Sequence, residues 1–166
     1  MSMKQVCAVL AATAVLGISA ASWAAADDVA VIVNKSNPVV AMTIVQLKAI
    51  LLGAGANWTS GNKITVIMTP AGQPERSGTI RIVCGMSETD FNMHFIHGWR
   101  NPDGSVNKKG SEHPKVLGTG LLVRQSIATE PYAVGFVKAS DVDDSVKVVT
   151  IDGSRPGDIA YKLKSK

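Results

Sequence analysis

Four short apolar runs along the chain have the pattern of buried β-strands. The first, residues 29–34, is hydrophobic up to its final Asn and rich in β-branched side chains, which is typical of a strand covered on both faces. Polar residues that include the Asn37-Pro38 pair follow it and predict a turn. Three more strands are expected over residues 63–68, 133–137 and 146–151.

Apolar positions at intervals of three and four predict helices between these strands. Thr43 is a suitable N-cap for a helix that Gly53 ends. Ser87, with Asp90 three residues later, has the spacing of a capping box, and its helix extends toward Trp99. Two further helices are expected, one beginning near Thr79–Ile80 and one over residues 121–127. This order of strands and helices predicts an α/β sandwich with a mixed sheet.

Residues 1–26 have the layout of a secretory signal peptide. Lys4 is the single charged residue before Asp27, an apolar stretch follows it, and two small-x-small cleavage sites end the segment. An uncleaved membrane anchor is the alternative, because the charge-free run is about long enough to span a bilayer. Cleavage after Ala26 predicts a mature domain of residues 27–166, periplasmic or secreted, with no stable membrane span.

Composition indicates one folded domain. The chain has 166 residues, of which 46% are hydrophobic and 18% charged, and this excludes a disordered protein. The formal net charge of +4 is dispersed along the chain, so no nucleic-acid partner is expected. The basic tail, residues 155–166, is expected at an edge of the fold.

Catalytic and metal-binding patterns are weak. His94, His97, His113 and Cys84 could together form a metal site, but a pair of surface or interface histidines is the preferred interpretation. After cleavage Cys84 would be the remaining cysteine, and a buried apolar thiol is expected there rather than a nucleophile. No enzyme activity, metal or cofactor is therefore predicted.

The segment Gln73-Pro-Glu-Arg-Ser-Gly-Thr79 carries the clearest candidate chemistry. It leads from an expected strand into an expected helix, where unpaired backbone N–H groups and the positive end of the helix dipole meet. Ser77 and Thr79 add hydroxyl donors, Gly78 permits close approach, and Arg76 adds positive charge, a combination that suits an oxyanion. The alternative interpretation of the same segment is an ordinary helix with a Ser/Thr cap and an exposed Arg.

Several motifs, in order along residues 29–140, resemble the phosphate-type substrate-binding proteins of ABC transporters. They are Asn34-Lys-Ser-Asn-Pro38 after a strand, a Leu-rich helix ending at Gly53, Trp58, Ser77-Gly-Thr79, and Ala133-Val-Gly-Phe-Val137. The resemblance implies one lobe of a type II periplasmic-binding-protein fold, a three-layer α/β sandwich with a mixed sheet. It also implies an exported, non-enzymatic protein that binds phosphate or a similar oxyanion at a helix N-terminus.

The resemblance implies which residues contact the anion. Ser77, Gly78 and Thr79 match the family's Ser-Gly-Thr, and Glu75 would accept from a protonated phosphate oxygen. Gln73 stands where the family has an Arg, so Arg76 supplies the charge if the loop bends differently.

The family clamps its anion between two lobes, whereas this chain has residues for one lobe. The alternative function is therefore a non-catalytic interaction module of the cell envelope. Such a module would keep the fold without binding solute, and its partner would be a second copy of the chain or an envelope protein.

Overall fold

The computed structural model describes residues 27–55, 57–97, 99–100, 106–107 and 112–165. The predicted signal peptide, residues 1–26, and most of the polar loop at residues 100–114 lie outside this set. Within the described part of the chain, no helix is both long and apolar enough to cross a bilayer.

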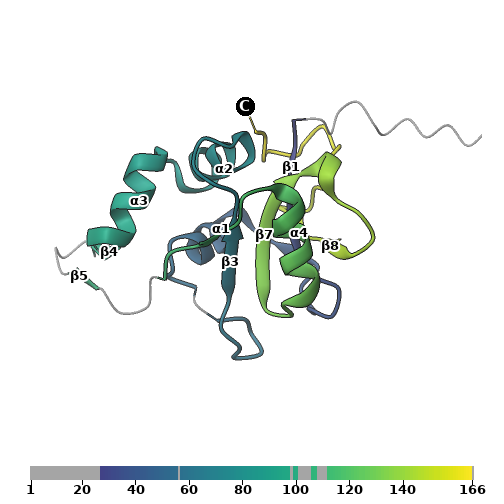
Figure 1. Cartoon of the computed structure of the whole chain (residues 1–166), viewed down its shortest axis with the longest axis horizontal. Coiled ribbons are helices and arrows are strands. Elements are labelled where there is room, and N and C mark those ends of the chain that lie inside the picture. Colours follow the sequence, from purple (N-terminus) through teal and green to yellow (C-terminus); the bar gives the residue numbers. More distant parts are fainter. Residues whose placement is uncertain (1–26, 56, 98, 101–105, 108–111, 166) are drawn as a thin grey trace, which may run out of the picture.

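A five-stranded mixed sheet, in the order β6-β3-β7-β1-β8, forms the centre of the molecule (Figure 1). Strands β3, β6 and β7 run parallel to one another, whereas β1 is antiparallel to both of its neighbours. The strands of this sheet are β1 (Val29–Asn34), β3 (Thr65–Met68), β6 (Lys115–Val116), β7 (Ala133–Lys138) and β8 (Val146–Val148). Two small pairs lie outside it: β2 (Ala41–Met42) with β9 (Thr150–Ile151), and β4 (Trp99–Arg100) with β5 (Val106–Asn107).

The strand predicted over residues 146–151 is wrong as a single element. Its first half, β8, pairs with β1, and its second half, β9, pairs with β2. The change of partner falls at Val149, whose N–H donates to Val31, whereas the N–H of Thr150 donates to Val40. An apolar run indicates that a strand is buried but not which strand pairs with it. The sequence pattern therefore could not show that residues 146–151 divide into two strands.

The predicted helices form, and the caps predicted at Thr43 and Ser87 are confirmed. Thr43 accepts a hydrogen bond from the N–H of Gln46 at 3.1 Å, and the hydroxyl of Ser87 accepts from the N–H of Asp90 at 3.1 Å. The described helices are α1 (Ile44–Leu51), α2 (Pro74–Thr79), its π-helical continuation η1 (Ile80–Cys84), α3 (Glu88–His97), α4 (Gly120–Thr129) and the 3-10 turn η2 (Ala139–Asp141).

The predicted three-layer α/β sandwich with a mixed sheet is confirmed. Alternate residues of β1 point to opposite faces, and all six are buried. Val31 belongs to a core shared with α1 and η1, whereas Ile32 belongs to a second core shared with α4. Figure 1 accordingly shows α4 on the near side of β7 and α1 on the far side of the sheet.

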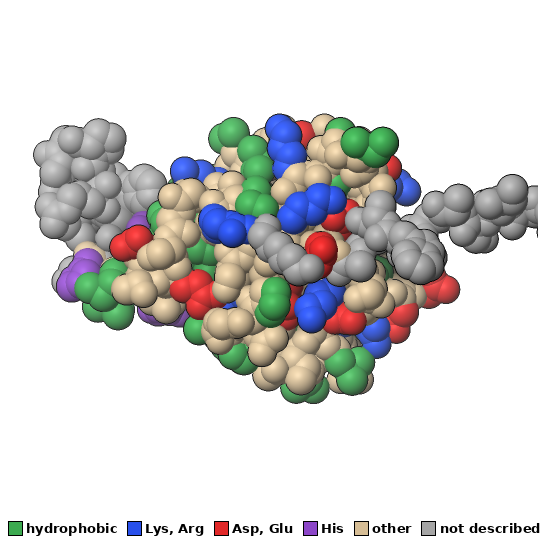
Figure 2. Space-filling model, turned by 90° about the horizontal axis from the view of Figure 1, so that it is seen from above, with side chains coloured by type: hydrophobic (Ala, Val, Ile, Leu, Met, Phe, Trp, Pro, Cys, Tyr) green, Lys and Arg blue, Asp and Glu red, His purple; other side chains and the backbone are tan. Residues whose placement is uncertain are grey.

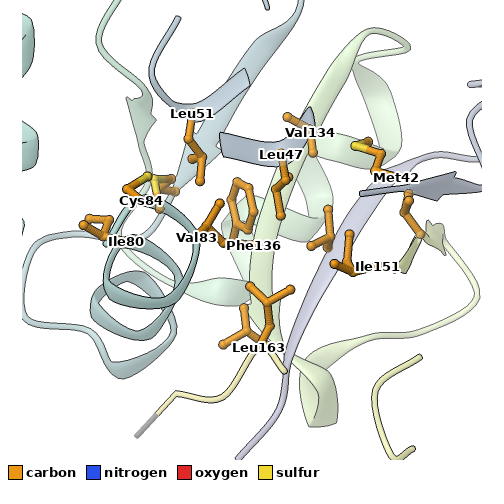
Figure 3. Close-up of a cluster of buried hydrophobic side chains, with 14 of the residues drawn as sticks. Met42, Leu47, Leu51, Ile80, Val83, Cys84, Val134, Phe136, Ile151 and Leu163 are labelled. Atoms are coloured by element: carbon orange, nitrogen blue, oxygen red, sulfur yellow. The ribbon is translucent and has the colours of Figure 1, made fainter. Parts of the chain in front are cut away.

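The larger core surrounds Phe136, which is fully buried (Figure 3). Helices α1 and η1, strand β7 and the C-terminal segment all contribute to it. The other labelled side chains in the figure are Met42, Leu47, Leu51, Ile80, Val83, Cys84, Val134, Ile151 and Leu163.

The C-terminal segment is built into the fold more deeply than its basic composition suggests. Leu163 is fully buried, and its carbonyl accepts from the N–H of Val29 at 2.9 Å. Lys164 forms an ion pair with Asp28, a fully buried carboxylate that also accepts from the N–H of Gly157 at 2.7 Å. The segment therefore fixes the start of β1 and closes one end of the core.

Candidate functional site

The carboxyl ends of β3 and β6 define the most promising site in the fold. These parallel strands are neighbours in the sheet, yet the chain leaves them toward opposite faces. The helix after β3 joins the larger core, whereas α4, after β6, joins the smaller one. Open α/β sheets bind ligands in the crevice where connections diverge in this way.

The helix after β3 begins earlier than the sequence predicts. It starts at Pro74 with Gln73 as its N-cap, and not near Thr79. Proline is favoured at the first helical position because its fixed φ suits the helix and its missing N–H loses no bond there. The N–H of Ser77 donates to the Gln73 carbonyl at 3.0 Å, so it is not one of the unpaired donors that the sequence analysis expected.

Four of the five predicted site residues are buried: Glu75, Arg76, Gly78 and Thr79. The Thr79 hydroxyl donates to the Glu75 carbonyl at 2.7 Å, and the Lys164–Ser165 backbone lies directly over Gly78. Ser77 is half-buried and lies nearest the surface. Anion binding by these residues stays a prediction.

Arg76 is the central side chain of the site. Its exposed fraction is 5%, and its Nη1 and Nη2 donate to the Thr69 carbonyl and to Asn92 Oδ1, both at 3.3 Å. The guanidinium carbon lies 5.7 Å from the ring centroid of Phe91, which adds a cation–π contact. Burial lowers the pKa of Arg76, and the negative charge of Glu88 opposes that shift.

Three buried polar atoms near Arg76 have no hydrogen-bond partner among the described residues: Thr69 Oγ1, Glu75 Oε2 and Arg76 Nε. Thr69 directly follows β3, and the other two residues lie in the first turn of α2. Buried polar groups are nearly always paired in folded proteins, so unpaired ones indicate a place for water or a polar ligand.

Glu88, a residue that the sequence analysis did not single out, completes the site. Its carboxylate accepts from the backbone N–H of Gly72 at 3.1 and 3.3 Å, and from the hydroxyl of Ser77. The capping box at Ser87 places Glu88 in the first turn of α3, but no local signal shows that it faces the loop before α2. Only the tertiary fold brings these groups together.

Cys84 is buried in the larger core, as the sequence predicts. Burial raises the pKa of its thiol to about 11, although Lys48 opposes the shift. At pH 8 the native thiol is therefore almost fully protonated, so we expect a thiol reagent to leave it unmodified. Mass spectrometry of the Cys84 peptide before and after denaturation measures this, and rapid labelling of the native protein would contradict it.

A mixed sheet with helices on both faces and a polar site at its strand ends is the architecture of one lobe of a type II periplasmic binding protein. Solved structures of phosphate-binding substrate-binding proteins share this fold. No protein-family model matches the chain, and no curated protein matches its sequence.

Three solved structures illustrate the similarity. A substrate-binding protein assigned to a phosphate ABC transporter of Clostridium perfringens, with bound phosphate, is 25% identical over 78% of this chain and 47% of its own, with a TM-score of 0.62. An ABC-type phosphate transport receptor from Vibrio cholerae is 24% identical over 78% and 48%, also at 0.62. PstS from Borrelia burgdorferi is 13% identical over 83% and 54%, again at 0.62. The chain thus spans about half the length of these structures.

Proposed function

We propose that this protein is exported, and that it binds phosphate or an oxyanion of similar shape without catalysing a reaction. The observation that carries the proposal is the burial of Arg76, which is 5% exposed and whose Nε has no partner within the described chain. The solved structure with 25% identity contains phosphate, which supports the choice of ligand.

Each group of the site has a part in this proposal. Arg76 supplies the charge, and the Thr69 hydroxyl adds a buried donor. The N–H of Gly72 and the hydroxyl of Ser77 are donors closer to solvent. Glu75 Oε2 is an acceptor for the proton of a hydrogen phosphate. Gly78 and Thr79 do not contact the anion in this proposal, because the C-terminal backbone covers Gly78 and the Thr79 hydroxyl is bonded to the Glu75 carbonyl. They contribute by forming helix α2.

Attraction of the anion must come from these local contacts. Figure 2 views the molecule from the side on which α2 lies in Figure 1, and Lys and Arg are interspersed there with Asp and Glu. A charge-assisted hydrogen bond contributes about 1.5–3 kcal/mol. Two or three of them predict a dissociation constant between about 1 mM and tens of micromolar, since 1 mM corresponds to about −4.1 kcal/mol.

Calorimetric titration of the purified protein with phosphate at low ionic strength tests the proposal. We expect saturable heat from the parent protein. Thr69→Val should weaken the affinity for phosphate about five- to tenfold, because the variant removes one buried donor. The same variant should be at least as stable as the parent, since it also removes an unpaired buried hydroxyl. Sulfate as competitor measures the selectivity.

Arginine variants provide a matched comparison. Arg76→Met should abolish the heat, whereas Arg155→Met, at an exposed position away from the site, should leave it unchanged. Heat that is equal in all variants, or absent up to several millimolar phosphate, would contradict the proposal. The alternative, an envelope interaction module, would then be tested by sedimentation at several protein concentrations.

A further inference from the structure

The carboxylate of Glu88 is held by donors that would suit a bound oxyanion. Its two oxygens lie 3.3 and 3.1 Å from the amide nitrogen of Gly72, and Oε1 also accepts from the Ser77 hydroxyl. The negative charge of Glu88 also acts on Arg76, because it raises the pKa of that guanidinium against the effect of burial. A backbone N–H and a hydroxyl that bind one carboxylate are donors that phosphate oxygens also accept.

We infer that Glu88 is an internal competitor for the oxyanion site. In the unliganded protein its carboxylate holds the outer donors, and an incoming phosphate must displace it to reach them and Arg76. This inference rests on the proposed function and adds an autoinhibitory contact to it. The affinity for phosphate is then set by the difference between two free energies, that of phosphate and that of the Glu88 carboxylate on the same donors, and not by the donors alone.

The position of Glu88 permits its displacement. The residue is half-buried and lies in the first turn of α3, a helix that projects from the side of the sheet in Figure 1. Beside it is an open hollow of about 550 Å³, lined by Ser77, Arg81, Ser87 and Asp90 among others. A change of side-chain rotamer would move the carboxylate into this hollow, where Arg81 offers a second cation, without unfolding the helix.

A purely structural role for Glu88 leads to a different expectation. The contacts to Gly72 and Ser77 join the loop before α2 to the start of α3. If that connection were their whole purpose, loss of the charge would loosen the site, and phosphate would bind more weakly or equally well. Competition predicts the opposite sign, so the direction of the change in affinity separates the two roles.

Glu88→Gln is the sharpest test, because glutamine keeps the size and one acceptor oxygen but loses the negative charge. In calorimetry we expect phosphate to bind the variant about tenfold more tightly than the parent. The reason is that phosphate no longer has to displace the charged Glu88 carboxylate from its donors. Asp144→Asn is the matched control. It makes the same change of charge at an exposed position before β8, at the opposite edge of the sheet from β6, and should change the affinity less than about twofold.

The outcomes separate the inference from the proposed function. Binding to the parent with equal or weaker binding to Glu88→Gln would overturn the competitor role and leave the proposed function standing. Binding to Glu88→Gln alone would support the competitor role but would contradict the proposed function, because the parent protein would then not bind phosphate. Heat from neither protein, with both folded by circular dichroism, would overturn the proposed function and the inference with it.

Discussion

Lys164→Met is expected to lower the free energy of unfolding by about 3 kcal/mol in urea denaturation. The substitution removes the cation that pairs with Asp28, whose carboxylate is fully buried. The N–H of Gly157 remains as a partner, but one neutral donor does not replace a charge. Lys162→Met is the matched control, because Lys162 is largely exposed and lies 3.9 Å from Asp152, and should cost less than about 0.5 kcal/mol.

The double variant Asp28→Asn/Lys164→Met checks the cause of that loss. Removal of the buried charge together with its partner should restore part of the stability lost in Lys164→Met alone. If Lys164→Met proved no more harmful than Lys162→Met, the ion pair would not fix the C-terminal segment to β1. If the double variant were the least stable, contacts other than charge would explain the loss.

Gly78→Ala should lower the free energy of unfolding by about 2–3 kcal/mol. A Cβ at this position would overlap the Lys164 carbonyl oxygen and come within 2.8 Å of the Cα of Ser165. Both atoms belong to the backbone, so the segment itself must move, and the 2.9 Å bond from Val29 N–H to the Leu163 carbonyl would weaken. Faster hydrogen exchange at the Val29 amide would report that displacement directly.

Gly118→Ala provides the comparison for Gly78→Ala. Gly118 precedes α4, and the nearest atom that its Cβ would meet is Leu122 Cδ1, at 4.0 Å. This variant should unfold within about 0.5 kcal/mol of the parent. Equal effects of the two substitutions would show that the C-terminal segment does not pack against α2 as described.

The elements that the sequence predicts well are those with a local cause. The continuous apolar run of β1 requires burial on both faces, and Thr43 and Ser87 cap their helices through neighbours three residues away. Strand β6 escaped prediction because its two exposed residues carry no pattern and gain their structure from β3 alone. The basic tail likewise owes its place to Asp28 and the core rather than to its own composition.

The candidate site shows the same division. The sequence indicates Arg76 and Ser77, because charged and hydroxyl residues follow a strand there. It misplaces the helix start, because Ser-Gly-Thr suggested a cap while Pro74 carried the stronger signal. The contacts that Thr69 and Glu88 make with residues 72–77 come from separate elements folded together, which a single sequence cannot show.

The N–H of Ser165 donates to the Asp27 carbonyl at 2.6 Å, so the described chain enters and leaves its fold at one point. A short linker could join these ends, and new ends could be opened at the exposed turn of residues 59–61 without breaking a strand of the sheet. The same geometry suits insertion, because a unit whose ends meet can be placed in a loop of another protein without forcing that loop apart. We expect either rearrangement to keep the strand order of the sheet while it changes where the polypeptide begins.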